Sequence, residues 1–295
     1  MKIKYSNDRF NELLRKDYTD NYIGQGNPDS KILIIGKECT STDYFFLNNA
    51  KIWKEKTSET IDDWFESNWN PESYHPRKPF LGQIMLKDNF TKKHPKTLET
   101  SNHGTSNTWK AYQKFINYLL PENKQVALRQ QLNFYDYCFM TELSSNCMPI
   151  SQKNDATKDS IKRRLGENGI LQHSFYKKFP VIIFTIYHYF DWYKDIPIIN
   201  SFDDEKLGIH YKYDGMIVPK ESYNKLKEED KNKWNASISH HNLHKGEFIN
   251  VHTAIDNDGM KHILLHTSHL TNRFNSKSDD LFMEMADIIK PYWNQ

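Results

Sequence analysis

The run Lys31-Ile32-Leu33-Ile34-Ile35-Gly36 is the stretch that decides the fold. Its apolar residues are continuous rather than alternating, and a glycine ends them. This pattern is typical of a strand buried on both faces, as in a parallel sheet. Gly24, Gly26 and Pro28 break the chain just before the run, so we expect the strand to begin near residue 31.

Other segments on both sides of this run carry regular patterns. We expect further strands at 134–143, 181–186, 248–255 and 260–267, the last two joined by a turn at 256–259. Helical spacing marks 7–17, 109–120, 155–170 and 278–290, and we also expect short helices such as 58–66 and a charged helix at 219–234. Strands that alternate with helices predict an α/β fold with a mostly parallel sheet covered on both faces.

The composition limits the class of protein. The chain has 295 residues, a net charge of +2 and an aromatic content of 14%, so we expect a core rich in rings and a basic surface only locally. Its three cysteines show no CxxC spacing, and no apolar run approaches the ~18 residues of a membrane span. We therefore expect a soluble cytoplasmic protein with no membrane partner.

Several chemically versatile residues follow strands. Parallel strands end at a common edge, where ligands bind in open α/β sheets, so residues 36–46, 141–147, 187–190 and 266–273 could meet there. Glu38 could orient a water or stabilise a cationic transition state, or it could simply cap a loop. Tyr44, Phe45 and Phe46 could stack on a base, or they could pack within the loop.

The later strand ends offer donors and acceptors. Glu142 could accept a hydrogen bond from an exocyclic amine such as cytosine N4, or lie at a surface strand end. His266 could act as an acid or base, or be structural. Leu270 is a candidate exposed wedge or a core residue, and Arg273 would serve a phosphate.

Cofactor signals are weak. His240, His241 and His244 invite a metal interpretation, but no acidic or cysteine partner stands at a diagnostic spacing, so we expect no metal site. The chain has no Walker loop, GxGxxG or GxSxG sequence, which argues against nucleotide hydrolysis, dinucleotide chemistry and a serine-hydrolase site. We expect no cofactor.

Two motifs carry a family resemblance. The segment Gly26 to Gly36 is similar to the lead-in GNPxAKxLxVG, and His266-Thr267-Ser268-His269-Leu270-Thr271 is similar to HPSPLS. Phe139 to Leu143 is similar to a strand that ends in a base-reading Asn, and Phe179 to Ile186 to a third core strand. The chain therefore resembles the uracil-DNA glycosylase superfamily.

The resemblance implies a three-layer α/β/α sandwich with a central, mostly parallel four-stranded sheet. It implies one domain over residues 1–295, with insertions near 47–108 and 200–250. It also implies cleavage of the N-glycosidic bond of a nucleotide flipped from DNA. In this role Glu38 would activate water and stabilise the oxocarbenium-like sugar, and His266 would stabilise the departing base anion.

The resemblance also implies contacts to DNA and base. Thr267 and Ser268 match a phosphate-binding turn, and Leu270 matches the residue that fills the vacated stack. We also expect His269 and Arg273 to contact DNA. The resemblance places Thr40, Thr141 and Glu142 at the base, and we also expect the rings of Phe45 and Phe46 to contact it by stacking.

Three departures bear on the substrate. In the first motif, Cys39 replaces a Pro and the smaller Thr40 replaces a Tyr that rejects groups on C5. Glu142 replaces the base-reading Asn, or Thr141 does if the register slips by one. The long segment 47–108 and the extra segment 200–250 could enlarge or cover the site. An ionised Glu suits a cytosine-type amine better than uracil O4.

We therefore expect a monofunctional, monomeric DNA glycosylase that excises a pyrimidine, such as a modified cytosine of phage DNA in antiviral defence. The alternatives are uracil excision in DNA repair, a non-catalytic nucleic-acid-binding module, and a metal-dependent hydrolase built on His240 and His244.

Overall fold

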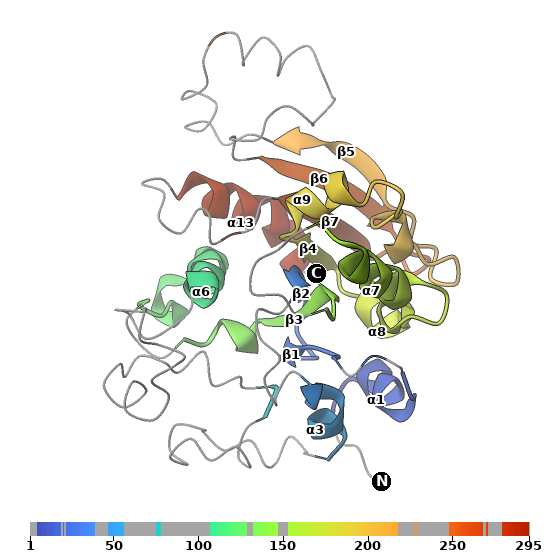
Figure 1. Ribbon diagram of the computed structural model, residues 1–295. Coiled ribbons are helices and arrows are strands. Elements are labelled where there is room, and N and C mark those ends of the chain that lie inside the picture. Colours follow the sequence, from blue (N-terminus) through green and yellow to red (C-terminus); the bar gives the residue numbers. More distant parts are fainter. Residues whose placement is uncertain are drawn as a thin grey trace.

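Figure 1 shows the computed structural model of the chain. The structure describes residues 5–18, 20, 22–38, 47–55, 75–77, 107–128, 132–146, 153–217, 228, 248–267, 270 and 279–294, with the side chains of 38, 107 and 187 left out. The statements below concern these residues. The expected helix at 58–66 lies outside them, and of 219–234 only Glu228 is described.

A mixed sheet of seven strands forms the centre of the described part of the chain, in the order β1-β3-β2-β4-β7-β6-β5. The strands are β1 (Gln25–Gly26), β2 (Ile32–Glu38), β3 (Cys138–Ser144), β4 (Val181–Phe184), β5 (Lys212–Ile217), β6 (Ile249–Ile255) and β7 (Lys261–Thr267). β3, β2, β4 and β7 are mutually parallel, whereas β1, β6 and β5 are antiparallel to their neighbours.

The α/β class is confirmed, but the expected number of four strands is wrong. The turn after β6 folds β7 back against it as a hairpin, which adds β6 antiparallel to the parallel strands. β5 then extends the hairpin, and β1 pairs with β3 at the opposite edge. Four parallel strands thus form the middle of a wider mixed sheet.

Helices cover both faces of this sheet (Figure 1). One face packs against α6 (Asn107–Leu119) and α13 (Asp280–Trp293). The other face packs against α1 (Asp8–Arg15), α3 (Asn49–Glu55), α7 (Asp155–Leu165), α8 (Ser174–Lys177) and α9 (Tyr187–Trp192). Short 3-10 turns occur at Glu122–Lys124, Phe134–Asp136, Ile170–Gln172 and Asn200–Phe202. We call the two faces the α6 side and the α9 side.

Strand alternation assigns each residue to a side. In β2, Ile32 and Ile34 belong to the core of the α6 side, while Leu33 and Ile35 belong to the core of the α9 side. Every one of these four side chains is fully buried. This burial on two faces is why the run is continuously apolar rather than alternating.

Local chemistry sets several element boundaries. The side chains of Asn7 and Asn154 accept hydrogen bonds from the backbone N–H groups of Phe10 and Thr157, at 3.0 and 2.8 Å, which caps α1 and α7. Gly26 has φ +96°, and an added Cβ would overlap the carbonyl oxygen of Cys138, so β1 approaches β3 only because residue 26 is glycine.

Two expected boundaries shift. The strand expected from residue 134 begins at Cys138 because Phe134–Asp136 form a 3-10 turn. The helix expected over 155–170 ends at Leu165, before Gly166. No described helix is long and apolar enough to cross a membrane.

Candidate functional site at the carboxyl edge of the parallel strands

The register brings the strand ends to one edge of the sheet. Ile35 of β2 and His266 of β7 both pair with Phe184 of β4, so the ends of β2 and β7 lie level on the two sides of β4. On the other side of β2, Glu142 pairs with Gly36. Segments more than 200 residues apart in sequence therefore end together.

His266 lies at this edge on the α9 side. Its half-buried ring is 4.5 Å from the ring of Phe190 and 5.4 Å from the ring of His252, measured between centroids. His252 in turn lies 5.3 Å from the ring of Tyr213, which is 44% exposed. A row of rings thus crosses from α9 over β7 and β6 to β5.

Asn250 lies next to His266, on the same face of the sheet as these rings. It pairs with His266 across the β6–β7 ladder and is fully buried. The Tyr213 hydroxyl donates a hydrogen bond to Asn250 Oδ1 at 3.4 Å, and Asn250 Nδ2 has no hydrogen-bond partner in the described structure. Asn250, His252 and Tyr213 were not among the residues expected at this edge. The alternation of residues 250 and 252 in an expected strand was the signal that could have placed Asn250 and His252 with His266, whereas Tyr213 lies on a strand that was not expected.

Glu142 lies on the α6 side, beside Gly36. A Cβ added to Gly36 would overlap the Glu142 carboxylate, so the carboxylate occupies the space that a side chain at position 36 would take. Tyr112 of α6 is nearby and buried. Burial, reinforced by the negative charge of Glu142, raises the pKa of the Tyr112 phenol, while a hydrogen bond with Thr185 opposes this rise. One carboxylate and a buried, neutral phenol therefore lie on this side of the strand ends.

Thr141 points to the opposite side from Glu142. It is buried, its hydroxyl donates to the carbonyl of Ile23 at 2.9 Å, and it accepts from Arg164 Nη2 at 3.2 Å. Arg164 Nη1 also lies 2.6 Å from Asp20 Oδ2 in a buried ion pair. These contacts give Thr141 a structural role, and Glu142 rather than Thr141 is the neighbour of Gly36.

Glu142 and His266 are not in contact. Their strands are three positions apart in the sheet, which corresponds to about 14 Å between backbones. Their side chains also belong to different sides, because Glu142 alternates with Leu143 of the α9 core and His266 with Leu265 of the α6 core. A ligand that touched both would have to lie across the carboxyl edge.

The end of β7 is more buried than expected. Thr267 is fully buried, and its hydroxyl donates to the carbonyl of Phe248 at 2.7 Å. Leu270, for which the sequence left open an exposed wedge or a core position, is fully buried in the core of the α6 side. The structure therefore agrees with the core alternative.

The remaining expected site residues are only partly described. Glu38 ends β2 and its backbone pairs with Ser144, but its side chain is outside the described part of the structure. The other expected residues outside it are Thr40, Phe45, Phe46, Ser268, His269 and Arg273. His240, His241 and His244 also fall outside, and the described residues contain no group of three or more His, Cys, Asp or Glu that could hold a metal.

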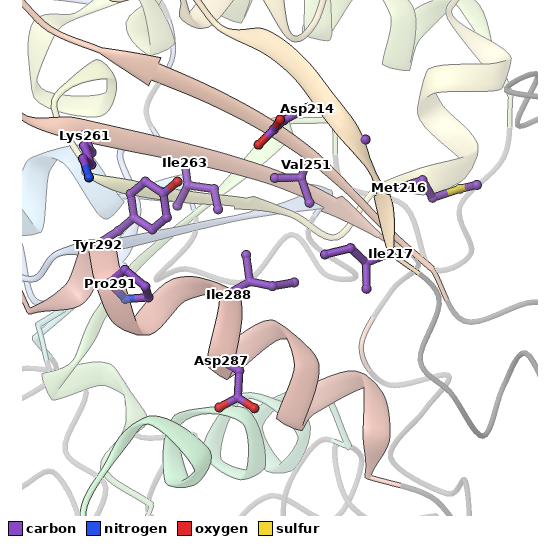
Figure 2. Close-up of a pocket in the computed structure, with 11 residues that line it drawn as sticks. Asp214, Met216, Ile217, Val251, Lys261, Ile263, Asp287, Ile288, Pro291 and Tyr292 are labelled. Carbon is purple, nitrogen blue, oxygen red and sulfur yellow. The ribbon is translucent and has the colours of Figure 1, made fainter.

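Two cavities lie away from this edge. One, of about 420 Å³, is formed between α13 and the strands β5, β6 and β7; Figure 2 shows Ile263, Val251 and Ile288 around it, with Asp287 pointing away. The other, of about 350 Å³, lies between α1 and α3. None of the expected site residues lines either cavity.

Comparisons of the chain with protein-family models, curated proteins and solved structures found no match.

Proposed function

We propose that the protein is a monofunctional DNA glycosylase that hydrolyses the N-glycosidic bond of a flipped pyrimidine. One observation carries the proposal: the two sequence motifs end their strands level with each other, on the two sides of β4. The backbones of β2 and β7 are two strand spacings apart, about 10 Å. A nucleoside placed over the end of β4 would have one motif on each side.

The chemistry needs two groups at these positions. Glu38 takes a proton from water as the water attacks the sugar C1′, and its charge stabilises the oxocarbenium-like sugar. The electrons of the broken bond go to the base, which leaves as an anion, and His266 donates a hydrogen bond to it. No covalent intermediate is needed, so one water is consumed for each base released.

The substrate we propose is a modified cytosine, as found in modified phage DNA, and the role is antiviral defence. Glu142 supports this choice because an ionised carboxylate accepts hydrogen bonds from an amine and repels a carbonyl oxygen. Thr40 supports it because threonine is smaller than the tyrosine that the resembling motif has at this position to reject groups on C5. Uracil excision in repair is the alternative substrate choice.

The test is a panel of single- and double-stranded oligonucleotides that contain uracil, 5-substituted cytosines or glucosylated cytosines. After incubation with the protein, alkali cleaves any abasic site. We expect product with at least one modified cytosine, and a loss of about 100-fold or more in rate for Glu38→Gln and His266→Gln. The exposed residues Glu205 and His210 provide matched controls, because Glu205→Gln and His210→Gln should keep the full rate.

The outcomes separate the alternatives. Product from uracil alone would support repair over defence. Binding to abasic DNA without release of any base would instead indicate a non-catalytic nucleic-acid-binding module. An unchanged rate in His266→Gln would remove that residue from the reaction.

A further inference from the structure

His266 lies between two different rings on the α9 side. The apolar ring of Phe190 is on one side of it, and the imidazole of His252 is on the other, with centroids 4.5 and 5.4 Å away and the two imidazole planes inclined by 36°. The ladder fixes this arrangement, because His252 pairs with Leu264 and Asn250 with His266. His252 is therefore the diagonal neighbour of His266 on the same face.

We propose that His252 is a positioning residue for His266: it takes up the first proton of the pair, and its charge keeps His266 neutral. The role in catalysis rests on the proposed glycosylase function, but the proton coupling itself can be measured without it. No sequence motif marks His252, and it lies on a strand outside the four parallel ones.

The distance between the two imidazole rings sets how strongly protonation of His252 disfavours protonation of His266. Two imidazolium charges about 5 Å apart repel each other, and near a protein surface this repulsion moves the second protonation by roughly one pH unit or more. The two rings then titrate as one system with two steps. Both histidines are partly buried, so water screens this repulsion less than it would at an exposed site.

The surroundings decide which ring is protonated first. His266 is packed against Phe190, on the side toward the centre of the sheet, and an apolar neighbour disfavours charge. His252 is packed against Tyr213, which is 44% exposed and lies on the edge strand β5, so charge there is better solvated. The first proton therefore goes to His252.

The other described titratable groups on the neighbouring elements are phenols, an ammonium, an imidazole and a carboxylate. Burial raises the pKa of Tyr213, so its phenol stays neutral. From β4 the neighbour is the apolar Phe184, and from β2 the ammonium of Lys37 lies over the rings of Tyr189 and Trp192 on α9. The titratable side chains described on α9 are His188, which stacks on Trp192, Tyr189 and Asp191.

The consequence for the reaction is a defined protonation state. A neutral His266 has one N–H to donate, and its other ring nitrogen is an acceptor. His252 supplies a nearby positive charge that favours the anion formed when the base leaves. The pair thus provides one donor and one charge from two residues.

The test is an NMR titration of the histidine ring protons in the full chain. We expect the His266 midpoint to rise by roughly one pH unit in His252→Gln, because the competing charge is gone. His252→Lys keeps a charge at the position, so the His266 midpoint should stay low. His262, which lies at the start of β7 with Asp256 as its partner, should be unaffected and serves as the internal reference.

An unchanged His266 midpoint in His252→Gln would overturn the proposal, as would an equal rise in His252→Lys, which would point to packing rather than charge. If DNA substrates are cleaved, the low-pH limb of the rate profile should move up by the same amount in His252→Gln. A midpoint shift in a protein that releases no base would leave the coupling intact and refute the glycosylase function alone.

Discussion

Near the carboxyl edge, the α6 side of the sheet carries a carboxylate, whereas the α9 side carries a buried ion pair, an ammonium and two imidazoles. On the α6 side, Glu142 lies against Gly36, with Tyr112 nearby. The α9 side holds the Asp20–Arg164 ion pair, Lys37, His252 and His266. Gly36 and Lys37 are adjacent in β2, and Thr141 and Glu142 are adjacent in β3, so strand alternation places Glu142 on the α6 side and Lys37 on the α9 side.

The two sides also differ in how their polar groups are held. On the α9 side, Arg164 is fixed by Asp20, Thr141 and the carbonyl of Tyr22, all buried contacts within ordinary bonding distance. On the α6 side, the Glu142 carboxylate is positioned by the absence of a side chain at residue 36. On the α9 side, a buried ion pair holds the polar groups in place. On the α6 side, the carboxylate keeps its position because it can approach a glycine closely.

The largest effect should come from breaking the charge pair. Arg164→Met removes the guanidinium and leaves the Asp20 carboxylate buried without its partner, which should lower the free energy of unfolding by about 3–5 kcal/mol. Urea denaturation at pH 7 measures this loss. Adding Asp20→Asn should recover part of it, and a loss below about 1 kcal/mol would show that the pair is not a main support of the α9 side.

The pH dependence of that loss follows from the pKa of Asp20. Burial alone would raise this pKa, but the charge of Arg164 and the hydrogen bonds from Tyr22, Arg164 and Ser145 together hold it below its usual value. Asp20 therefore stabilises the fold above its unfolded pKa of about 3.9, and this contribution is lost as the pH falls through the folded pKa. In Arg164→Met burial dominates and the pKa rises, so the stability gap to the wild type should narrow on acidification.

An intermediate effect should come from filling the space at Gly36. Gly36→Ala places a methyl group where the Glu142 carboxylate lies, so the carboxylate must move, at a cost of about 1–3 kcal/mol. The double variant Gly36→Ala/Glu142→Ala removes the clash and should be more stable than Gly36→Ala alone. Additive losses in the double-mutant cycle would contradict the contact between these residues.

The strands and helices could be predicted where the sequence carries a clear signal, such as an apolar run or a helix cap. The apolar runs at 32–35 and 181–184 are buried on both faces, and asparagine caps begin α1 and α7. β5 gave no comparable signal, because Lys212, Tyr213 and Asp214 are exposed at an edge and the strand contains a bulge near Gly215. The number of strands was therefore underestimated.

For the candidate site, the sequence predicted which strand ends lie at one edge, but it did not predict on which face of the sheet each side chain lies. The resemblance left Thr141 and Glu142 as alternatives, because a slip of one residue exchanges them. Only the pairing of Glu142 with Gly36 shows which one lies on the α6 side. Likewise, the contact between His252 and His266 depends on the register of the β6–β7 hairpin, which sequence spacing alone does not fix.

The smallest effect should come from Thr267, which follows His266 and belongs to the other side. Its hydroxyl holds the end of β7 to Phe248 at the start of β6, so Thr267→Val should cost about 1 kcal/mol, whereas Thr267→Ser should cost less because it keeps the hydroxyl. The same pair of variants tests the phosphate contact that the sequence motif implies. If Thr267 also serves DNA, Thr267→Val should weaken binding to an abasic oligonucleotide beyond any effect of lost stability, and the weakening should depend on salt. If binding is unchanged while stability falls, the buried hydroxyl serves only the hairpin, and the phosphate contact that the motif implies is refuted for Thr267.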